Sequence, residues 1–253
     1  MPTSTFWNQV RLITPSLEPL LTLFQGQTWE QMVWWPVEWT GGWAMETAIP
    51  DRVRAVETPQ LAVVRTPLPH RLAVWTSGSH PGTLFLAQEA VASEGEGLPD
   101  DRIAASAIEV LAGSGVSRCT LLGNGWLTGP EPAGSLVGVR DHINWSKDNI
   151  LLGYPVEDDT PSRFIDTQTL HHPPPSLPSV IALYGSPPAM QTPAEWGVAR
   201  QLGAEVVTDG AIPLALLAHF KRMETRVVLR IRGSLNDGQL IARSGEWEGG
   251  WLS

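Results

Sequence analysis

The sequence has one cysteine, no long apolar run and no export signal. Cys119 is the only cysteine among 253 residues, so no internal disulfide can form, and a reducing cytoplasm is the expected location. No apolar run reaches the roughly 18 residues that a membrane-spanning helix needs. The first ten residues lack the basic start and apolar core of a signal peptide. We therefore expect no membrane partner and no export.

Positive charge is also scarce. The 17 Lys and Arg residues are outnumbered by 26 Asp and Glu residues, which gives a net charge of −9. Because nonspecific binding to nucleic acids depends on clustered Lys and Arg, and no basic stripe is present, we expect no nucleic-acid partner. The chain is instead rich in Pro (22), Gly (24) and Trp (12), which predicts many turns and several large aromatic anchors.

The spacing of apolar residues predicts strands that alternate with helices. Residues 10–14 have the pattern of a strand, with a turn at Pro15 and Ser16 and a capped helix over residues 17–24. Further strands are expected at 61–64, 71–75, 118–122, 135–142, 180–184, 205–208 and 226–231, and helices at 102–112, 193–202 and 212–220. This alternation predicts a single α/β domain over residues 1–253, with helices packed on a mostly parallel or mixed sheet.

Three segments between residues 136 and 213 carry motifs in a distinctive order. The first contains Asp141-His142-Ile143-Asn144, the second is RFID at 163–166, and the third, at 184–213, is YGSPPAMQTPAEWGVARQLGAEVVTDGAIP. In order and spacing they resemble the "DHIN", "RF.D" and "ETPAE…LGAD.VGMS" motifs of the trimeric purine nucleoside phosphorylase and methylthioadenosine phosphorylase family.

The resemblance implies a nucleoside phosphorylase fold, a three-layer α/β/α arrangement with a mixed central sheet. It implies a homotrimer with active sites near subunit contacts, and a pentosyltransferase reaction in which phosphate cleaves the N-glycosidic bond of a purine nucleoside. It implies no cofactor, because phosphate would be a co-substrate, and only if the chain is active. Fold transfers between relatives more safely than function does.

Residues that would hold phosphate in this family are replaced. The family's first loop matches residues 14–20, where Pro15 stands for a serine and Glu18 for a glycine, with Ser16 beside them. A proline offers no amide hydrogen, and a carboxylate repels an anion. The family's Arg-x-His loop matches residues 78–80, which keep His80 but contain no guanidinium.

The last loop and the purine end are altered as well. Thr208-Asp209-Gly210 stands for the family's Gly-Met-Ser, so the phosphate-binding hydroxyl is missing and an acid occupies the position that packs on ribose. Gln191 replaces the glutamate that hydrogen-bonds the base, and Met190 replaces an aromatic residue. Glutamine can donate and accept hydrogen bonds but carries no charge. The candidate ligand-binding residues are Ser16, His80, Gly123, Met190, Gln191 and Asp209, and the candidates for a catalytic role are Asp209 and Gln191.

Each of these side chains also has a simpler interpretation. His80 is either a retained anion ligand or a solvated turn histidine, and the second is favoured slightly. Asp209 is either an acid or base facing a pocket or a residue that caps a turn or helix. Gln191 either contacts a base edge or is a polar residue at the start of a helix.

Several other histidine, tryptophan and cysteine residues are expected to have structural rather than catalytic or ligand-binding roles. His171 and His172 are expected to be a solvated pair, since no further His or Cys lies at ligand spacing, and no metal site is expected. The tryptophans from Trp29 to Trp43 are expected to pack in the core or at a subunit contact rather than to bind ligand. Cys119 is expected to be a buried structural thiol.

Three functions remain open. The replaced residues favour a non-catalytic member of the family, a binding or structural homo-oligomer with a degenerate phosphate and purine site. The alternatives are an active nucleoside phosphorylase with altered specificity and a nucleoside hydrolase in which Asp209 assists water. A purine base or nucleoside is the expected ligand in each case except a purely structural role.

Overall fold

The computed structural model describes residues 3–21, 28–35, 61–65, 71–76, 80–89, 101–128, 136–146, 149–152, 154, 171–185, 193–208 and 210–234. The chain divides into two units. The first comprises Met1–Thr120, Leu151–Thr160 and Lys221–Met223, and the second comprises Leu121–Ile150, Pro161–Phe220 and Glu224–Ser253.

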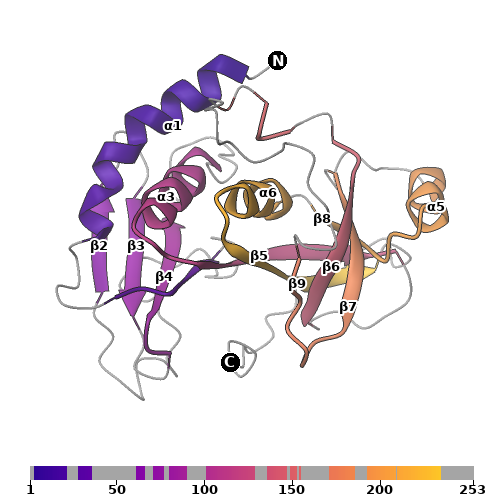
Figure 1. Cartoon of the computed structure of the whole chain (residues 1–253). Coiled ribbons are helices and arrows are strands. Elements are labelled where there is room, and N and C mark those ends of the chain that lie inside the picture. The colour runs from indigo at the N-terminus through magenta and orange to yellow at the C-terminus, as the bar shows by residue number, and fades with distance from the viewer. Residues whose placement is uncertain are drawn as a thin grey trace. The chain divides into compact units, whose positions relative to one another are not determined.

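The described residues of the first unit include the apolar strands β1 to β4, of which Figure 1 labels β2, β3 and β4. They are β1 (Gln31–Trp35), β2 (Leu61–Arg65), β3 (Arg71–Thr76) and β4 (Thr83–Glu89). β2, β3 and β4 pair antiparallel in sequence order, and β4 pairs in parallel with β1. Leu72, Leu84 and Leu86 are fully buried, which fits strands that lie inside the unit.

The strand expected at residues 10–14 is wrong, because these residues belong to a helix. α1 (Thr3–Leu17) continues into the short 3-10 helix η1 (Glu18–Leu21) and packs beside α3 (Asp101–Gly113), as Figure 1 shows. The buried side chains recur at a helical spacing in Trp7, Val10, Ile13, Leu17 and Leu20. Pro15 lies in the last turn of the helix, where it cannot donate the helical hydrogen bond to the carbonyl four residues before it.

The second unit contains most of β5 and four further strands. Its elements are β5 (Arg118–Leu127), β6 (Leu136–Asn144), β7 (Ser179–Tyr184), α5 (Pro193–Gln201), β8 (Val206–Thr208), α6 (Ile212–Phe220) and β9 (Glu224–Ser234). β6, β7 and β8 run parallel, while β5 pairs antiparallel with β8 and β9 antiparallel with β6. A further pairing between β5 and β9 closes these strands into a ring.

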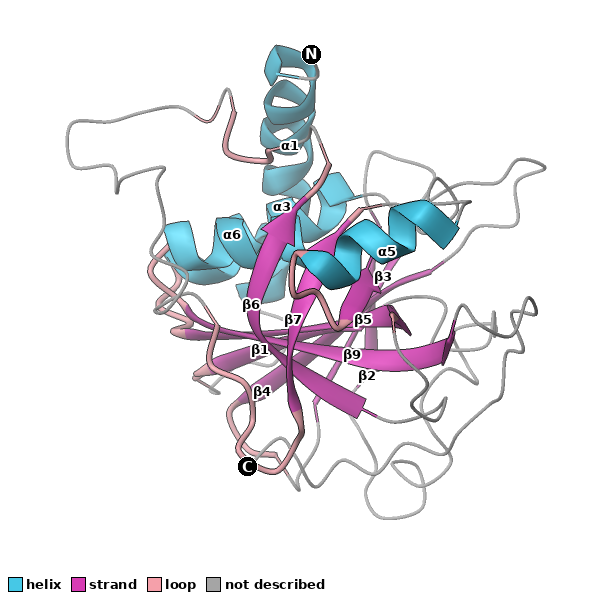
Figure 2. Cartoon of the chain, turned by 90° about the vertical axis from the view of Figure 1, so that its right-hand side faces the viewer, coloured by secondary structure: helices cyan, strands magenta, loops and turns pink. Residues whose placement is uncertain are grey.

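Helix α5 covers one face of the parallel strands (Figure 2). Trp196 and Ala199 of α5 form a buried cluster with Leu183 of β7 and Val207 of β8, and Trp126 and Ile143 pack against it. The cluster fixes α5 over the strands through contacts that exclude water from large apolar side chains.

The strand expected at 118–122 is longer than predicted, since β5 continues through Leu127. A Cβ atom built on Gly125 would lie 2.6 Å from Cγ1 of Val206, and one built on Gly123 would lie 3.0 Å from Cδ2 of Leu229. The two glycines are therefore sites of close strand packing, not turn residues.

The α/β class with a mixed sheet is confirmed. The helices expected near 102–112, 193–202 and 212–220 are present within two residues of the expected ends. Cys119 is buried, as expected, and burial raises the pKa of its thiol. Trp34 is also buried in the core, while Trp39 and Trp43 lie outside the described residues. No described helix has the length and apolar composition required to span a bilayer.

Candidate functional site

The carboxyl ends of β6, β7 and β8 form one edge of the second unit, and hydrogen bonds join them. The amides of Trp145 and Ser146, just after β6, donate to the carbonyl oxygen of Tyr184 at 2.9 and 3.1 Å. The amide of Gly185, just after β7, donates to the carbonyl oxygen of Thr208 at 2.9 Å. Parallel strands in α/β proteins bind ligands at this edge, so we examine it as the candidate site.

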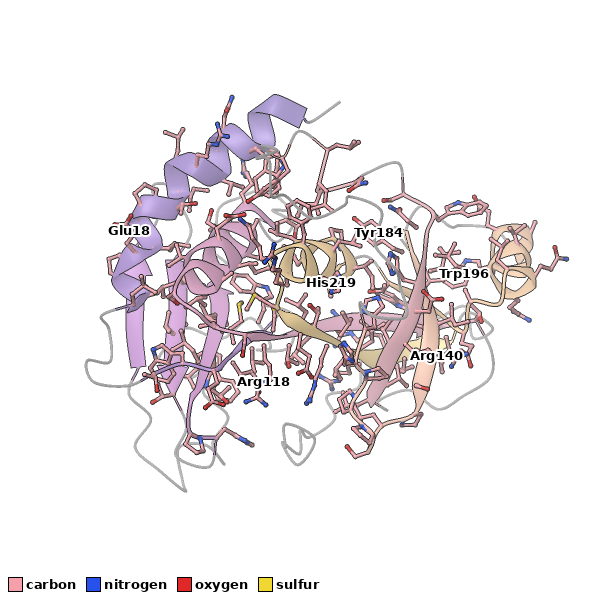
Figure 3. The ribbon with its side chains drawn as sticks, viewed as in Figure 1. Glu18, Arg118, Arg140, Tyr184, Trp196 and His219 are labelled. Carbon is pink, nitrogen blue, oxygen red and sulfur yellow. The ribbon has the colours of Figure 1, made fainter. Side chains whose placement is uncertain are left out.

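The end of β6 supplies polar and aromatic side chains. Ser146 donates a hydrogen bond from Oγ to Oδ1 of Asn144 at 3.0 Å, and Asn144 is exposed. Between them the Trp145 side chain is 54% exposed, which is unusual for an indole of this size. The backbone hydrogen bonds to Tyr184, labelled in Figure 3, hold this aromatic surface in place.

The end of β8 leads directly into α6. Thr208 is buried, and its hydroxyl donates to the carbonyl oxygen of Asn124 at 2.8 Å. After Gly210 the backbone reverses at Ala211, whose φ of 61° lies in the left-handed region that side chains rarely adopt. Such backbone strain occurs often at functional sites.

The first turn of α6 offers few hydrogen-bond donors to an anion. The amide of Ile212 donates to the carbonyl oxygen of Gly210 at 2.6 Å, and the amide of Ala215 donates to that of Ala211 at 2.8 Å. Pro213 has no amide hydrogen. The side chains of residues 211–214 are apolar and buried, so this helix start does not resemble the amide-rich termini that bind phosphate.

Ser16 does not lie at the end of a strand. It is in the last turn of α1, where its hydroxyl donates to the carbonyl oxygen of Ile13 at 2.6 Å. The first strand among the described residues is β1, which ends at Trp35, so residues 14–20 do not form the strand-end loop to which Ser16 and Pro15 were assigned. Pro15 lies in α1 and Glu18 in η1, so neither stands in a phosphate loop after a strand.

Of the other expected site residues, two can be located. His80 lies in the bend between β3 and β4 in the first unit, where its carbonyl oxygen accepts from the amide of Thr83 at 3.2 Å and its ring faces Phe85 edge-on. Gly123 lies in β5, where an added Cβ would be 3.3 Å from Cβ of Ala211. The structure thus brings Gly123 and the segment after Asp209 together. Met190, Gln191 and Asp209 themselves lie outside the described residues.

His171 is not part of a solvated pair, which corrects the sequence-based expectation. Its side chain is only 4% exposed, and its Nε2 lies 3.0 Å from Nδ1 of His142 on β6. His172 is exposed, as expected. The sequence signal that could have indicated this pair is weak, because His142 and His171 are far apart in the chain.

The residues that sequence reasoning missed are Trp145, Ser146 and Tyr184. Each directly ends or follows a parallel strand, and that position is the only signal the sequence gives. Within the described ranges, no three His, Cys, Asp or Glu side chains gather as metal ligands would.

The fold is similar to solved structures of purine nucleoside phosphorylases. Purine nucleoside phosphorylase from Schistosoma mansoni in complex with adenosine has a TM-score of 0.63 and 14% identity, covering 94% of this chain and 88% of the other. The enzyme from Schistosoma in complex with hypoxanthine has a TM-score of 0.62 and 15% identity, with coverage of 93% and 87%. Its complex with a monocyclic inhibitor has a TM-score of 0.62, 15% identity and coverage of 92% and 90%.

Sequence comparison adds no relative. No family model matches the chain, and no curated protein matches it. At such low identity the similarity to solved structures defines the fold alone. The chain has the purine nucleoside phosphorylase fold.

Proposed function

We propose that the chain is a divergent member of the purine nucleoside phosphorylase family that binds a purine base or nucleoside without catalysing ordinary phosphorolysis. The observation that carries this proposal is the start of α6, where Ile212 and Ala215 have intramolecular partners and Pro213 has no amide hydrogen. A site that cleaves with phosphate must hold a dianion, and the described residues of this segment offer few hydrogen-bond donors to one.

The same edge suits an uncharged planar ligand. Trp145 presents an exposed indole face on which a heterocycle can stack, and Asn144 and Ser146 beside it carry amide and hydroxyl groups. The similar Schistosoma enzyme is known in complex with hypoxanthine, guanosine and adenosine, which supports this choice of ligand class.

The proposal also assigns roles to the remaining site residues. Gln191 and Met190 contact the base, and Asp209 faces the sugar. Gly123 leaves space beside residues 210–211, and His80 is a turn residue rather than a catalyst. The chain acts as a single domain and a cytoplasmic homotrimer without cofactor. The match of the solved structures to more than nine-tenths of the chain supports the single domain.

A binding and turnover assay on the full chain tests the proposal. We expect hypoxanthine or guanosine to raise the melting temperature equally with and without phosphate, and no base to be released from inosine, guanosine or methylthioadenosine. Trp145→Ala should remove this shift, whereas Leu12→Ala, which alters an exposed side chain of α1, should retain it.

The outcomes separate the alternatives. Base release that requires phosphate would contradict the proposal in favour of an active phosphorylase. Release without phosphate would show a hydrolase. If neither a shift nor any release is observed, the chain does not bind purines and the structural role remains.

A further inference from the structure

A pair of histidines joins two segments of the second unit that are far apart in sequence. His142 lies on β6, and His171 lies in the segment that precedes β7. Nδ1 of His142 and Nε2 of His171 are 3.0 Å apart, with the rings nearly perpendicular at 83°. One nitrogen must donate and the other must accept, so this hydrogen bond requires that at least one ring is neutral.

Protonation of the His171 ring is strongly disfavoured in this position. His171 is 4% exposed, and its other ring nitrogen, Nδ1, is buried without a hydrogen-bond partner. Protonation of that nitrogen would place a charge in a buried position with nothing to compensate it. Burial, and then the neighbouring histidines, lower the pKa of His171 to about 3, and burial also lowers the pKa of His142.

Among the described residues, no acidic side chain compensates a charge on His171. Its ring is near His142 on β6, His172 next to it and His219 on α6, which Figure 3 labels. Asp141 favours the charged form of His142, but its Oδ1 accepts a hydrogen bond from the backbone amide of His142 at 2.7 Å. The nearby ionic side chains are paired elsewhere, Arg140 with Glu205 and Arg226 with Glu224.

The segment that His171 anchors has few backbone hydrogen-bond donors. Four of its eight residues, 171–178, are proline, and proline cannot donate a backbone hydrogen bond. Backbone bonds hold its ends, from the His172 amide to the Thr225 carbonyl at 3.0 Å and from the Gly138 amide to the Pro178 carbonyl at 2.8 Å. Between them Pro173 lies directly over Gly138, where an added Cβ would come within 2.7 Å.

We propose that the His142–His171 pair is a proton-sensitive clasp, and that mild acid releases residues 171–178 from β6 and β9 while the helices of the first unit stay folded. The released segment leads directly into β7, so the carboxyl edge at Tyr184 loosens with it. The device is independent of which ligand the edge binds.

The direction of the pH dependence follows from linkage. The open segment binds the proton at the ordinary histidine pKa of about 6.5, whereas the closed segment resists it down to a much lower pH. The clasp is therefore at full strength above about pH 7. Below about pH 6.5, opening becomes up to about tenfold more favourable for each unit that the pH falls.

Hydrogen–deuterium exchange on the full chain, corrected for the intrinsic effect of pH, measures this opening. From about pH 7.5 to about pH 5, protection of peptides covering residues 136–146 and 171–185 should fall about tenfold or more, while that of residues 101–113 should not change. His171→Gln, which keeps a hydrogen-bonding group but does not titrate, should abolish the dependence. His172→Gln, a change at the exposed neighbour, should preserve it.

Three results would overturn the clasp: protection in the wild-type protein that is equal at both pH values, an unchanged pH dependence in His171→Gln, or simultaneous loss of protection throughout the chain. If His171→Gln does not fold, nitrogen-15 spectra of the wild-type imidazoles decide the matter. The hydrogen-bonded pair must disappear together with the protection as the pH falls, and a pair that persists at about pH 5 would contradict the proposal.

Discussion

At the scale of single residues, glycines in β5 serve packing rather than turning. Gly123 and Gly125 suggest a loop in the sequence because glycine pairs are typical of turns. In the structure both are buried, and the strand continues because Leu229 and Val206 approach the backbone closely. Local sequence could not show this, since the approaching side chains come from β8 and β9.

Gly125→Ala should therefore destabilise the protein. The new Cβ would lie 2.6 Å from Cγ1 of Val206, so β5 and β8 must move apart, and we expect a loss of about 1–3 kcal/mol in the free energy of unfolding. Urea denaturation measures it. Gly197→Ala on α5 is the control, because its Cβ meets no atom within 4 Å and should stabilise the helix by about 0.5–1 kcal/mol. Equal effects of the two changes would show that close packing at β5 is not the cause.

At the scale of elements, α1 shows what the sequence could have revealed. Residues 10–14 are rich in apolar and β-branched residues and end at a proline, which favours a strand when the window is short. The longer window from Trp7 to Leu20 has the spacing of a helix, and burial follows that spacing. By contrast α3, α5 and α6 could be predicted well, because each has helical periodicity bounded by turn residues.

A cluster in the first unit connects α3 to three other segments. Glu109 accepts a hydrogen bond from the Tyr154 hydroxyl at 3.0 Å and pairs with Nζ of Lys221 at 2.7 Å, while Trp7 meets the Tyr154 ring edge-on. Burial lowers the pKa of Lys221, but Glu109 and Tyr154 outweigh it and the pKa is raised overall.

Tyr154→Phe should cost about 1 kcal/mol in the free energy of unfolding, because one partly buried hydrogen bond is lost while the contact with Trp7 remains. Chemical denaturation followed by circular dichroism checks this. Glu30→Gln is the matched change in an exposed ion pair with Arg118 and should cost less than about 0.5 kcal/mol. A loss from Tyr154→Phe no larger than that of Glu30→Gln would contradict the expectation.

The turn between β8 and α6 allows a gain-of-function test. Gly210 stands where the resemblance places a phosphate-binding serine, its φ is not left-handed, and an added Cβ meets no atom within 4 Å. Gly210→Ser should therefore fold normally and bind phosphate more tightly than Gly210→Ala by roughly fivefold, the effect of about 1 kcal/mol from one hydroxyl. Thermal shifts in increasing phosphate compare the two. Identical shifts would mean that this turn does not face an anion site.

At the scale of the whole chain, the motifs from Asp141 to Pro213 predicted the fold correctly, although overall identity to the similar structures is only 14–16%. Order and spacing of motifs persist because they fix strands and helix starts. The site was less predictable. Trp145 and Tyr184 were singled out by their positions at strand ends, and His171 by its contact with His142, 29 residues away in the sequence. Neither feature can be recognised from the neighbouring residues in the sequence.

The most direct measurement is a calorimetric titration of phosphate into the full chain, with and without a saturating purine base. The scarcity of donors among the described residues at the start of α6 predicts no saturable heat below about 10 mM phosphate in either case. A saturable curve with a dissociation constant of about 1 mM or tighter would show that the chain binds phosphate. That result would contradict the proposal that the chain binds purines without catalysing phosphorolysis.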